Sequence, residues 1–314
     1  TAFSYLLPLF GAVIVDKYIG ARYTTPVGMF IAAAGYFTGG IAKSSAGVYA
    51  MIFLVSLGLA LFKNGAIIGR VITDKSQMDP AFSMRYTLVN VGAFIGTFLV
   101  GILYKDVFAK DGVLGFAPCF KMAALMMVLG GLWYIFVCWR FLGDLGKLPF
   151  KKTLTEEEKA AEAKKKEETG TKQPLTTIEK KRIGAIFVAS LFSIVFWIFW
   201  YLGYMPVYFY WAENMDWVVA GYQVPSTWFD AANSLFCVIL GPVTAALWKK
   251  LAARPQGDMS LFRKTGLGIA IIGVGYLFYA AIDIMRGGEK ASVLWLIVFA
   301  FLLTMGEMFF SPLG

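Results

Sequence analysis

The sequence predicts an all-α membrane protein that crosses the bilayer many times. Hydrophobic residues make up 58% of the 314 residues and charged residues only 16%, against about 25% charged residues in a typical soluble domain. The apolar residues gather in long runs, and a helix needs about 20 mostly apolar residues to cross the hydrocarbon layer. A backbone in lipid must satisfy its own hydrogen bonds, so we expect these runs to be helices.

Nine apolar runs are candidate spans. In chain order they cover residues 1–15, 24–43, 47–72, 82–104, 118–142, 183–209, 226–252, 262–286 and 292–314. Because the chain begins and ends inside such runs, we expect it to be part of a longer protein. A charged segment separates the first five spans from the last four, so we divide the chain into an N-terminal bundle (1–147), a linker (148–182) and a C-terminal bundle (183–314).

The linker is rich in Lys, Glu and Ala, and it ends at a capping box that opens the sixth span, formed by Thr176 and Glu179. Of the 29 basic residues, 22 fall in one alternating set of loops that includes this linker. Lys and Arg favour cytoplasmic loops, so we place that set in the cytoplasm. We expect a multi-pass protein of the plasma or inner membrane.

Several classes of function are excluded by residues that the sequence lacks. The net charge is +9, but the basic residues lie in short segments between spans, which does not favour nucleic-acid binding. The chain has no His, and its three Cys stand apart in apolar runs, so we expect no metal site. No nucleophile, base and orienting group occur together, so we expect no enzyme and no cofactor. The absence of His also removes the usual proton carrier near neutral pH, so any coupling to a proton gradient would use carboxylates.

Two charged residues lie inside predicted spans. Lys63 falls near the middle of 47–72, and Glu307 falls within 292–314. A charge at the bilayer centre costs about 2.5–3.5 kcal/mol on insertion scales, so such residues normally face a partner, water or a ligand. Opposite charges from the two bundles suit the two ends of a zwitterion. The structural alternative is a buried pair that only holds two helices together.

Glycines spaced by four recur within the spans, as in Gly35 with Gly39, Gly65 with Gly69, and Gly92 with Gly96. Small residues at this spacing let membrane helices approach closely. We therefore expect helix packing at these pairs.

Four motifs resemble known transporter signatures. The segment from Gly11 to Arg22, with Asp16, Lys17 and Gly20, resembles the loop signature of the major facilitator superfamily. Three others resemble signatures of its proton-dependent oligopeptide transporter family: Phe62-Lys63-Asn64, the segment 85–94, and the segment 306–312. The similarity runs through the whole chain, in the order of that family's second to tenth helices. It implies two helical bundles that carry di- and tripeptides with protons by alternating access.

The resemblance also implies roles for individual residues. Lys63 matches a lysine implicated in substrate and proton coupling, and Glu307 matches a glutamate that engages the peptide's amino end and that we also expect to take part in proton coupling. The substrate site would further include Tyr5, Asn233 and Trp197. The signature residues Tyr86, Asn90 and Gly92 are expected to pack helices together, Asn90 through a hydrogen bond between helices.

The sequence departs from the family pattern in three places. Asn64-Gly65 stands where a proline follows the lysine, Arg85 replaces an aromatic residue, and Tyr201-Leu202 stands where relatives often have Glu-Gln. Two alternatives therefore remain beside a peptide carrier in the lipid bilayer. One is a carrier of another small solute, such as nitrate or a drug-like molecule. The other is a scaffold or receptor that keeps the fold without transport.

Overall fold

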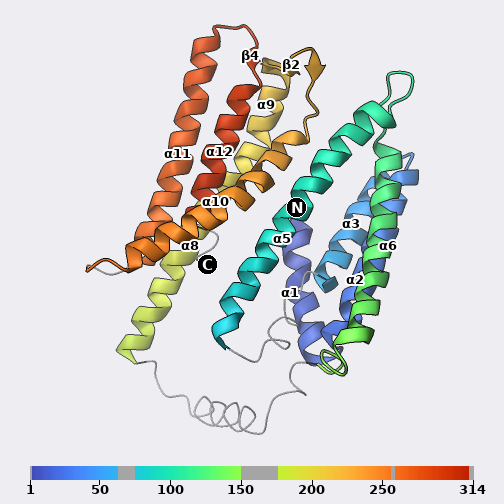
Figure 1. Ribbon diagram of the computed structural model, residues 1–314, viewed down its shortest axis with the longest axis vertical. Helices are drawn as coiled ribbons and strands as arrows, with labels where there is room; N and C mark the ends of the chain where they lie inside the picture. The colour runs from blue at the N-terminus through green and yellow to red at the C-terminus, as the bar shows by residue number, and fades with distance from the viewer. Residues whose placement is uncertain (1, 63–74, 150–175, 256–258, 311–314) are drawn as a thin grey trace. The chain divides into compact units, whose positions relative to one another are not determined.

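The computed structural model describes residues 2–62, 75–149, 176–255 and 259–310. Contacts divide the chain into two compact units, coloured along the sequence in Figure 1. The first unit is Thr1–Met84 with Leu103–Gln173, and the second is Arg85–Ile102 with Pro174–Gly314. Each unit is described here by itself, and the division into two bundles and a linker remains a prediction.

In the first unit, α2 (Ala21–Ile41) is the central helix. It packs against α3 (Ser45–Phe62) and α6 (Phe116–Phe141), while α1 (Ala2–Lys17) packs against α3. The α2–α3 contact is close because both helices present glycine there: a Cβ on Gly28 would lie 2.6 Å from the carbonyl oxygen of Gly58. The long helix α5 (Lys75–Ile102) contributes its first turns to this unit and continues into a π-helical turn, η1 (Leu103–Val107).

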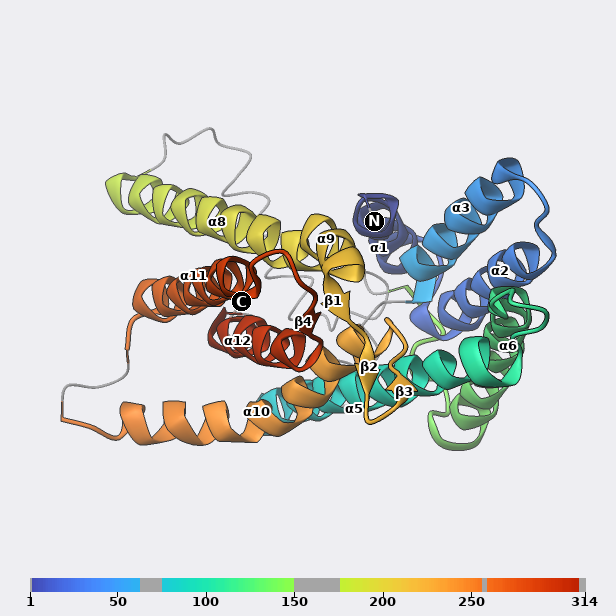
Figure 2. The same cartoon turned by 90° about the horizontal axis from the view of Figure 1, so that it is seen from above.

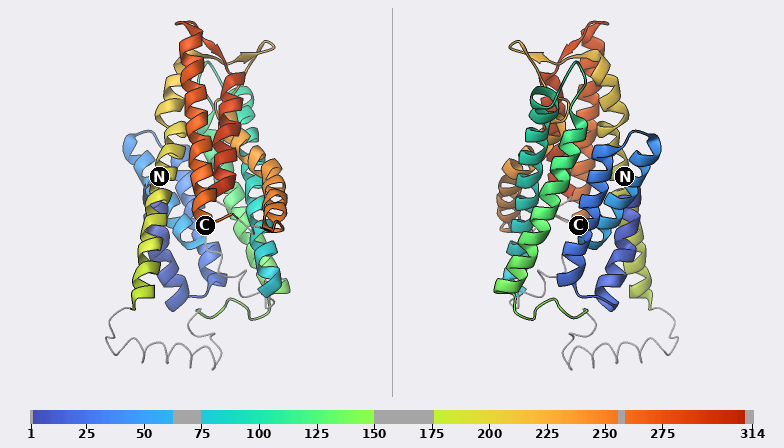
Figure 3. Two further views of the ribbon diagram at one scale, coloured as in Figure 1. Left: turned by 90° about the vertical axis from the view of Figure 1, so that its left-hand side faces the viewer. Right: turned by 90° about the vertical axis from the view of Figure 1, so that its right-hand side faces the viewer.

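In the second unit, α12 (Leu294–Phe310) lies between α10 (Trp228–Ala252) and α11 (Leu261–Arg286), as the left view of Figure 3 shows. The core contains Phe196, Phe299 and Leu303, each at most 1% exposed. Phe196 comes from α8 (Thr177–Tyr204), whose first turn has the capping box predicted for Thr176 and Glu179. Apolar side chains from four helices therefore hold α12 in the middle of this unit.

Short strands fix the ends of two helices in the second unit (Figure 2). After α9 (Pro206–Asn214), β1 (Met215–Asp216) pairs in parallel with β4 (Ala291–Ser292), which leads into α12. Strands β2 (Val218–Val219) and β3 (Tyr222–Gln223) form a hairpin between β1 and α10. At the same end, Arg286 donates hydrogen bonds to both Asp283 and Tyr210, 2.7 Å each, and so ties α11 to α9. Sequence analysis did not predict these strands.

Helices occupy all nine predicted spans within the described residues. Six of the helical segments are long and apolar enough to cross a membrane, and two further apolar segments, Leu6–Val15 and Leu294–Phe310, are shorter. One span differs from the prediction, because 183–209 is interrupted at Met205 and α9 starts at Pro206. Proline has no N–H group for the preceding turn, so it is tolerated where a new helix begins.

The expected packing of glycine pairs is found in part. Gly35 and Gly39 face α3, where added Cβ atoms would meet Val55 and Met51. Cβ atoms on Gly92 and Gly96 would meet no atom within 4 Å, so packing there stays a prediction. The pair Gly65 and Gly69 lies outside the described residues.

Candidate functional site

The side chain of Glu307 lies inside the second unit. It is on α12, three residues after Thr304, and is only 7% exposed. Asn233 on α10 donates from Nδ2 to Glu307 Oε2 at 3.1 Å and to Thr304 Oγ1 at 2.9 Å. Thr304 Oγ1 in turn donates to the carbonyl oxygen of Ala300 at 2.7 Å. These bonds fix one carboxylate oxygen between α10 and α12.

Aromatic groups from other helices complete the surroundings of this carboxylate. The Trp200 indole and the Tyr86 hydroxyl also point their N–H and O–H groups at Glu307 as weak hydrogen-bond donors. The Tyr86 hydroxyl also lies 3.7 Å from Cys237 Sγ on α10. Tyr204, one turn after Trp200, also interacts electrostatically with Glu307. We call these residues the Glu307 cluster: Tyr86, Trp200, Tyr204, Asn233, Cys237, Thr304 and Glu307.

Two donors of the cluster are buried without a hydrogen bond of normal geometry. They are Trp200 Nε1 and the Tyr204 hydroxyl. An unpaired buried polar group costs about 1–3 kcal/mol, so such groups are rare where no water or ligand completes them. Trp200 Nε1 is directed at Glu307 without good geometry, so the Tyr204 hydroxyl is the donor whose hydrogen-bonding capacity the described cluster leaves unused.

Trp197 forms an aromatic wall beside the cluster. Its ring packs edge-to-face against Trp200, with centroids 5.5 Å apart, and against Phe310, with centroids 6.3 Å apart. Phe196 stacks on Phe310 at 4.1 Å. Trp197 is half-buried, so one part of its ring is held by neighbours while another part stays accessible.

The chemistry of the cluster is that of a buried anion held by neutral donors. The ion pairs found among the described residues do not include Glu307. Amide, indole and phenol groups stabilise a carboxylate without neutralising it, and an uncompensated buried charge is costly. Such a group attracts a cation, either a proton or an ammonium group. Lys63, the predicted partner of opposite charge, lies outside the described residues.

A second polar contact lies in the first unit and involves the predicted loop motif. Arg22 donates from Nη1 to the carbonyl oxygen of Gly143, and its backbone N–H donates to the carbonyl oxygen of Gly146 at 3.1 Å. Gly143 and Gly146 have positive φ angles of 51° and 75°, which glycine adopts without strain. Gly20 packs directly on the backbone at Gly146. We call these four residues the Arg22 contact.

The other predicted residues are distributed as follows. Tyr5 and Asp16 lie on α1, but their side chains are outside the described part, and Lys17 is exposed in the last turn of that helix. Asn90 donates to the carbonyl oxygen of Tyr86, four residues earlier on the same helix, at 3.0 Å. This bond lies within α5, whereas sequence analysis predicted a hydrogen bond between helices. The proposed packing role of Gly92 remains a prediction.

Sequence analysis missed Trp200, Tyr204, Thr304 and Cys237 as members of the cluster, and it assigned Tyr86 to packing. Spacing offered one signal. Trp197, Trp200 and Tyr204 are separated by three and four residues, and so are Ala300, Thr304 and Glu307, which places each set on one helix face. The many aromatic residues of the chain obscured this pattern.

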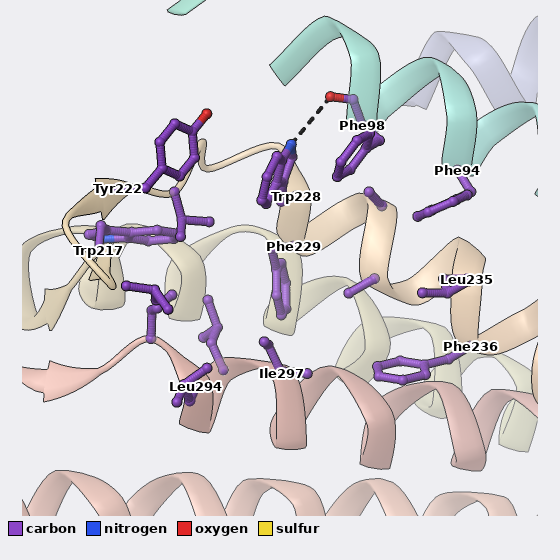
Figure 4. A pocket seen from close by; sticks show the side chains of 16 residues that line it. Phe94, Phe98, Trp217, Tyr222, Trp228, Phe229, Leu235, Phe236, Leu294 and Ile297 are labelled. Atoms are coloured by element: carbon purple, nitrogen blue, oxygen red, sulfur yellow. Dashed lines mark hydrogen bonds between the residues drawn. The ribbon is translucent and has the colours of Figure 1, made fainter. Parts of the chain in front are cut away.

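An apolar cavity of about 450 Å³ lies elsewhere in the second unit (Figure 4). Phe94 and Phe98 of α5, Trp228 of α10 and Ile297 of α12 line it, and the Trp228 indole donates to the carbonyl oxygen of Phe98 at 3.2 Å. Its volume is typical of ligand pockets. However, neither Glu307 nor Asn233 lines it, so we place the candidate site by its polar groups rather than by this cavity.

The chain is similar to known peptide transporters. The chain is 23% identical over 363 residues to a di-/tripeptide transporter of Lactococcus lactis subsp. cremoris, covering 100% of this chain and 71% of that protein. It is also 23% identical over 357 residues to the dipeptide and tripeptide permease B of Xenorhabdus bovienii, covering 100% of this chain and 70% of that protein.

Solved structures show the same fold. A peptide transporter POT in complex with alafosfalin superposes with a TM-score of 0.82 at 24% identity, covering 100% of this chain and 70% of that one. A POT family transporter in complex with 5-aminolevulinic acid superposes with a TM-score of 0.83 at 22% identity, covering 100% and 72%. The fold is thus that of the major facilitator superfamily.

The sequence profile of the POT family matches residues 136–314, which is more than half of the chain. This match covers α8 to α12 and therefore the helices that supply most of the Glu307 cluster. The chain is a multi-pass integral membrane protein of a transporter family and not an enzyme. It belongs to the POT family.

Proposed function

We propose that this protein carries di- and tripeptides across the membrane together with protons, by alternating access. The observation that carries the proposal is the buried carboxylate of Glu307, which is held by Asn233 and faced by aromatic donors. A free peptide has an ammonium group at its amino end, and this group would supply the positive charge that the cluster lacks. The relatives named as di- and tripeptide carriers support the same class of substrate.

The predicted residues have distinct roles in this proposal. Glu307 receives the peptide's amino group, and Asn233 orients the carboxylate and contacts the same end of the peptide. Trp197 and Tyr5 form part of the wall around the peptide. Lys63 attracts the peptide's carboxylate and, with Glu307, couples binding to protonation. The two bundles, 1–147 and 183–314, move relative to each other, and the segment 148–182 connects them.

A proton enters the cycle because it changes the charge of the site. Protonating Glu307 removes the negative charge that holds the ammonium group, so the peptide binds the two protonation states with different affinity. Alternating access requires such a difference between states, since a ligand shifts an equilibrium only by its differential affinity.

A second candidate substrate is a small amino acid-like molecule. One relative of known structure is described in complex with 5-aminolevulinic acid. Such a molecule would be held at Glu307 in the same way as a peptide. Competition of 5-aminolevulinic acid against labelled dipeptide would measure how far the site accepts it.

The test is uptake of a labelled dipeptide into proteoliposomes with an imposed pH gradient, acidic outside. We expect accumulation above the external concentration that disappears when an ionophore collapses the gradient. Lys63→Ala should abolish this accumulation, while Lys290→Ala, which changes an exposed loop residue, should not. Uptake of nitrate or a drug-like solute in place of peptide would favour another carrier, and absence of uptake for every solute would favour a scaffold or receptor.

A further inference from the structure

A second carboxylate of the C-terminal unit lies close to the Glu307 cluster. Asp230 occupies the first turn of α10, within a segment, Trp228–Leu251, that is apolar and long enough to span the membrane. It precedes Asn233 by three residues and Cys237 by seven. Residues at these spacings share one face of a helix, so Asp230 lies on the face of α10 that carries two members of the cluster.

The hydrogen bonds of Asn233 show at which level along α12 Asp230 lies. Asn233 bonds to Thr304, which is ten residues into α12. At a rise of 1.5 Å per residue, this point is about 15 Å from the start of that helix. Asp230 is at most about 4.5 Å from Asn233 along the axis of α10. Asp230 therefore lies within about one helical turn of the level of Thr304, and its own side chain is exposed.

One buried phenol connects Asp230 electrostatically with the Glu307 cluster. The buried hydroxyl of Tyr204, on α8, interacts electrostatically with both Asp230 and Glu307. It makes no hydrogen bond of normal geometry. Cys237 on α10 and Tyr276 on α11 act on the same phenol. Tyr86 on α5 reaches the region through Cys237. Within the described helices, none of the observed ion pairs involves Asp230.

Other acidic residues of this unit do not match this position. Between Glu179 and Glu213, α8 and α9 carry no acidic residue. Asp283 on α11 is paired with Arg286 and bonded to Tyr210. Within residues 183–209, 226–252, 262–286 and 292–310, Asp230 and Glu307 are thus the acidic residues for which no ion pair is observed. Their separate surroundings would allow one of them to hold a substrate's ammonium group while the other holds a proton.

We propose that Asp230 is a proton-binding residue of the transport cycle, with Tyr204 linking it to Glu307. This inference rests on the proposed function. The Asp230 carboxylate accepts a proton from the outer solution and becomes a neutral acid. It remains neutral while the site reorients, and it then releases the proton to the inner solution. Glu307 holds the peptide's amino group while the site reorients, and its own protonation then favours release of the peptide.

The structural alternative is that Asp230 only stabilises the start of α10. A negative charge in the first turn of a helix interacts favourably with the helix dipole. Asp230→Asn keeps the size of the side chain and removes its ability to carry a proton. The matched control is Glu213→Gln, which neutralises an exposed acid at the end of α9.

Two transport modes separate the roles. Gradient-driven uptake needs proton coupling, whereas counterflow, the exchange of labelled for unlabelled dipeptide without a gradient, needs only binding and reorientation. A gradient of about one pH unit can drive about a tenfold accumulation per coupled proton. We expect Asp230→Asn to lose this accumulation and keep counterflow, Asp230→Glu to restore accumulation, and Glu213→Gln to behave like the parent.

Each outcome decides the inference. If Asp230→Asn accumulates dipeptide like the parent, or loses counterflow and accumulation to the same extent, Asp230 is not a proton-binding residue. Failure of Asp230→Glu to restore accumulation would also overturn it. If the parent protein itself shows no gradient-driven accumulation, the proposed function fails instead, and the two failures are distinguished by that measurement.

Discussion

The Arg22 contact and the Glu307 cluster both join segments that are distant in sequence, but they satisfy their polar groups differently. In the Arg22 contact, backbone carbonyl groups at Gly143 and Gly146 accept the hydrogen bonds, and glycine allows the turn that presents them. In the Glu307 cluster, a charge is buried among neutral donors, and two of the donors, Trp200 Nε1 and the Tyr204 hydroxyl, make no hydrogen bond of normal geometry.

This difference separates a structural contact from a binding site. A contact whose groups are fully paired gains little from a ligand and holds its segments in one arrangement. A cluster with an unmatched charge and unused donors is stabilised by a ligand that completes it. We therefore expect substitutions in the Arg22 contact to change stability and substitutions in the Glu307 cluster to change transport.

The largest expected effect is that of Glu307→Gln on dipeptide uptake. Loss of one partner of a buried, hydrogen-bonded charge pair costs about 2–5 kcal/mol, which corresponds to a decrease of about 30-fold or more. The glutamine keeps the volume of the side chain, so the thermal midpoint of the purified protein should change little. Glu289→Gln, at an exposed turn after α11, is the control. Normal uptake by Glu307→Gln would remove the cluster from the transport site.

Gly20→Val should lower stability and leave dipeptide binding unchanged, the opposite of Glu307→Gln. The new side chain would overlap the backbone at Gly146 and Lys147, and overpacking of this kind costs about 1–3 kcal/mol. We expect a lower thermal midpoint in detergent, with dipeptide affinity per folded molecule unchanged. The control is Gly184→Val, because a Cβ there meets no atom within 4 Å. A change in affinity at unchanged stability would contradict the assignment of Gly20 to a structural contact.

A smaller effect is expected for Asn233→Ala. It removes the hydrogen bonds of an uncharged amide to the Glu307 carboxylate and to Thr304. The carboxylate that holds the substrate stays in place, so we expect a loss of about 0.5–1.5 kcal/mol, as for a typical net hydrogen bond. The half-saturating dipeptide concentration should rise by about two- to tenfold. Asn214→Ala, which removes a bond to the carbonyl oxygen of Tyr210 at the end of α9, should leave it unchanged. An effect as large as that of Glu307→Gln would mean that Asn233, rather than the carboxylate, holds the substrate.

The smallest expected effect is on how the thermal midpoint depends on pH. Lys147 lies 2.6 Å from Asp144 Oδ1 beside the Arg22 contact and lowers the pKa of that carboxyl. A lowered pKa stabilises the fold above the unfolded pKa of about 3.9, and this contribution is lost as pH falls through the folded value. Asp144→Asn should therefore lie slightly below the parent in thermal midpoint at pH 6 and approach it as the pH falls through the lowered pKa of Asp144. A larger difference at low pH would contradict the pairing.

The helices were predictable from the sequence because apolar runs report directly on membrane spans. Composition alone placed α6, α10 and α11 to within a few residues. The break at Met205 was not predicted, since Pro206 stands inside a continuous apolar run. The strands β1 and β4 were also missed, because each has two residues and its partner lies more than 70 residues away.

The candidate site was predictable where charge or resemblance marked a residue. Glu307 is conspicuous because it is acidic within an apolar run, and resemblance added Asn233, which does bond to it. Trp200 and Tyr204 could not be selected in the same way, since the chain has nine Trp and 15 Tyr. Asp230 was overlooked because it opens its helix, and only the bonds of Asn233 show that it lies near the level of the cluster.

The central claim is that the Glu307 carboxylate receives the peptide's amino group, and inhibition by blocked peptides tests it most directly. The measurement is the ratio of inhibition constants for N-acetyl-Ala-Ala and free Ala-Ala against labelled dipeptide uptake or binding. The account predicts a strong preference for the free dipeptide in the parent and a ratio near one in Glu307→Gln. If Glu307→Gln binds dipeptides and still prefers the free amino end as strongly as the parent, another group recognises that end and the account is wrong.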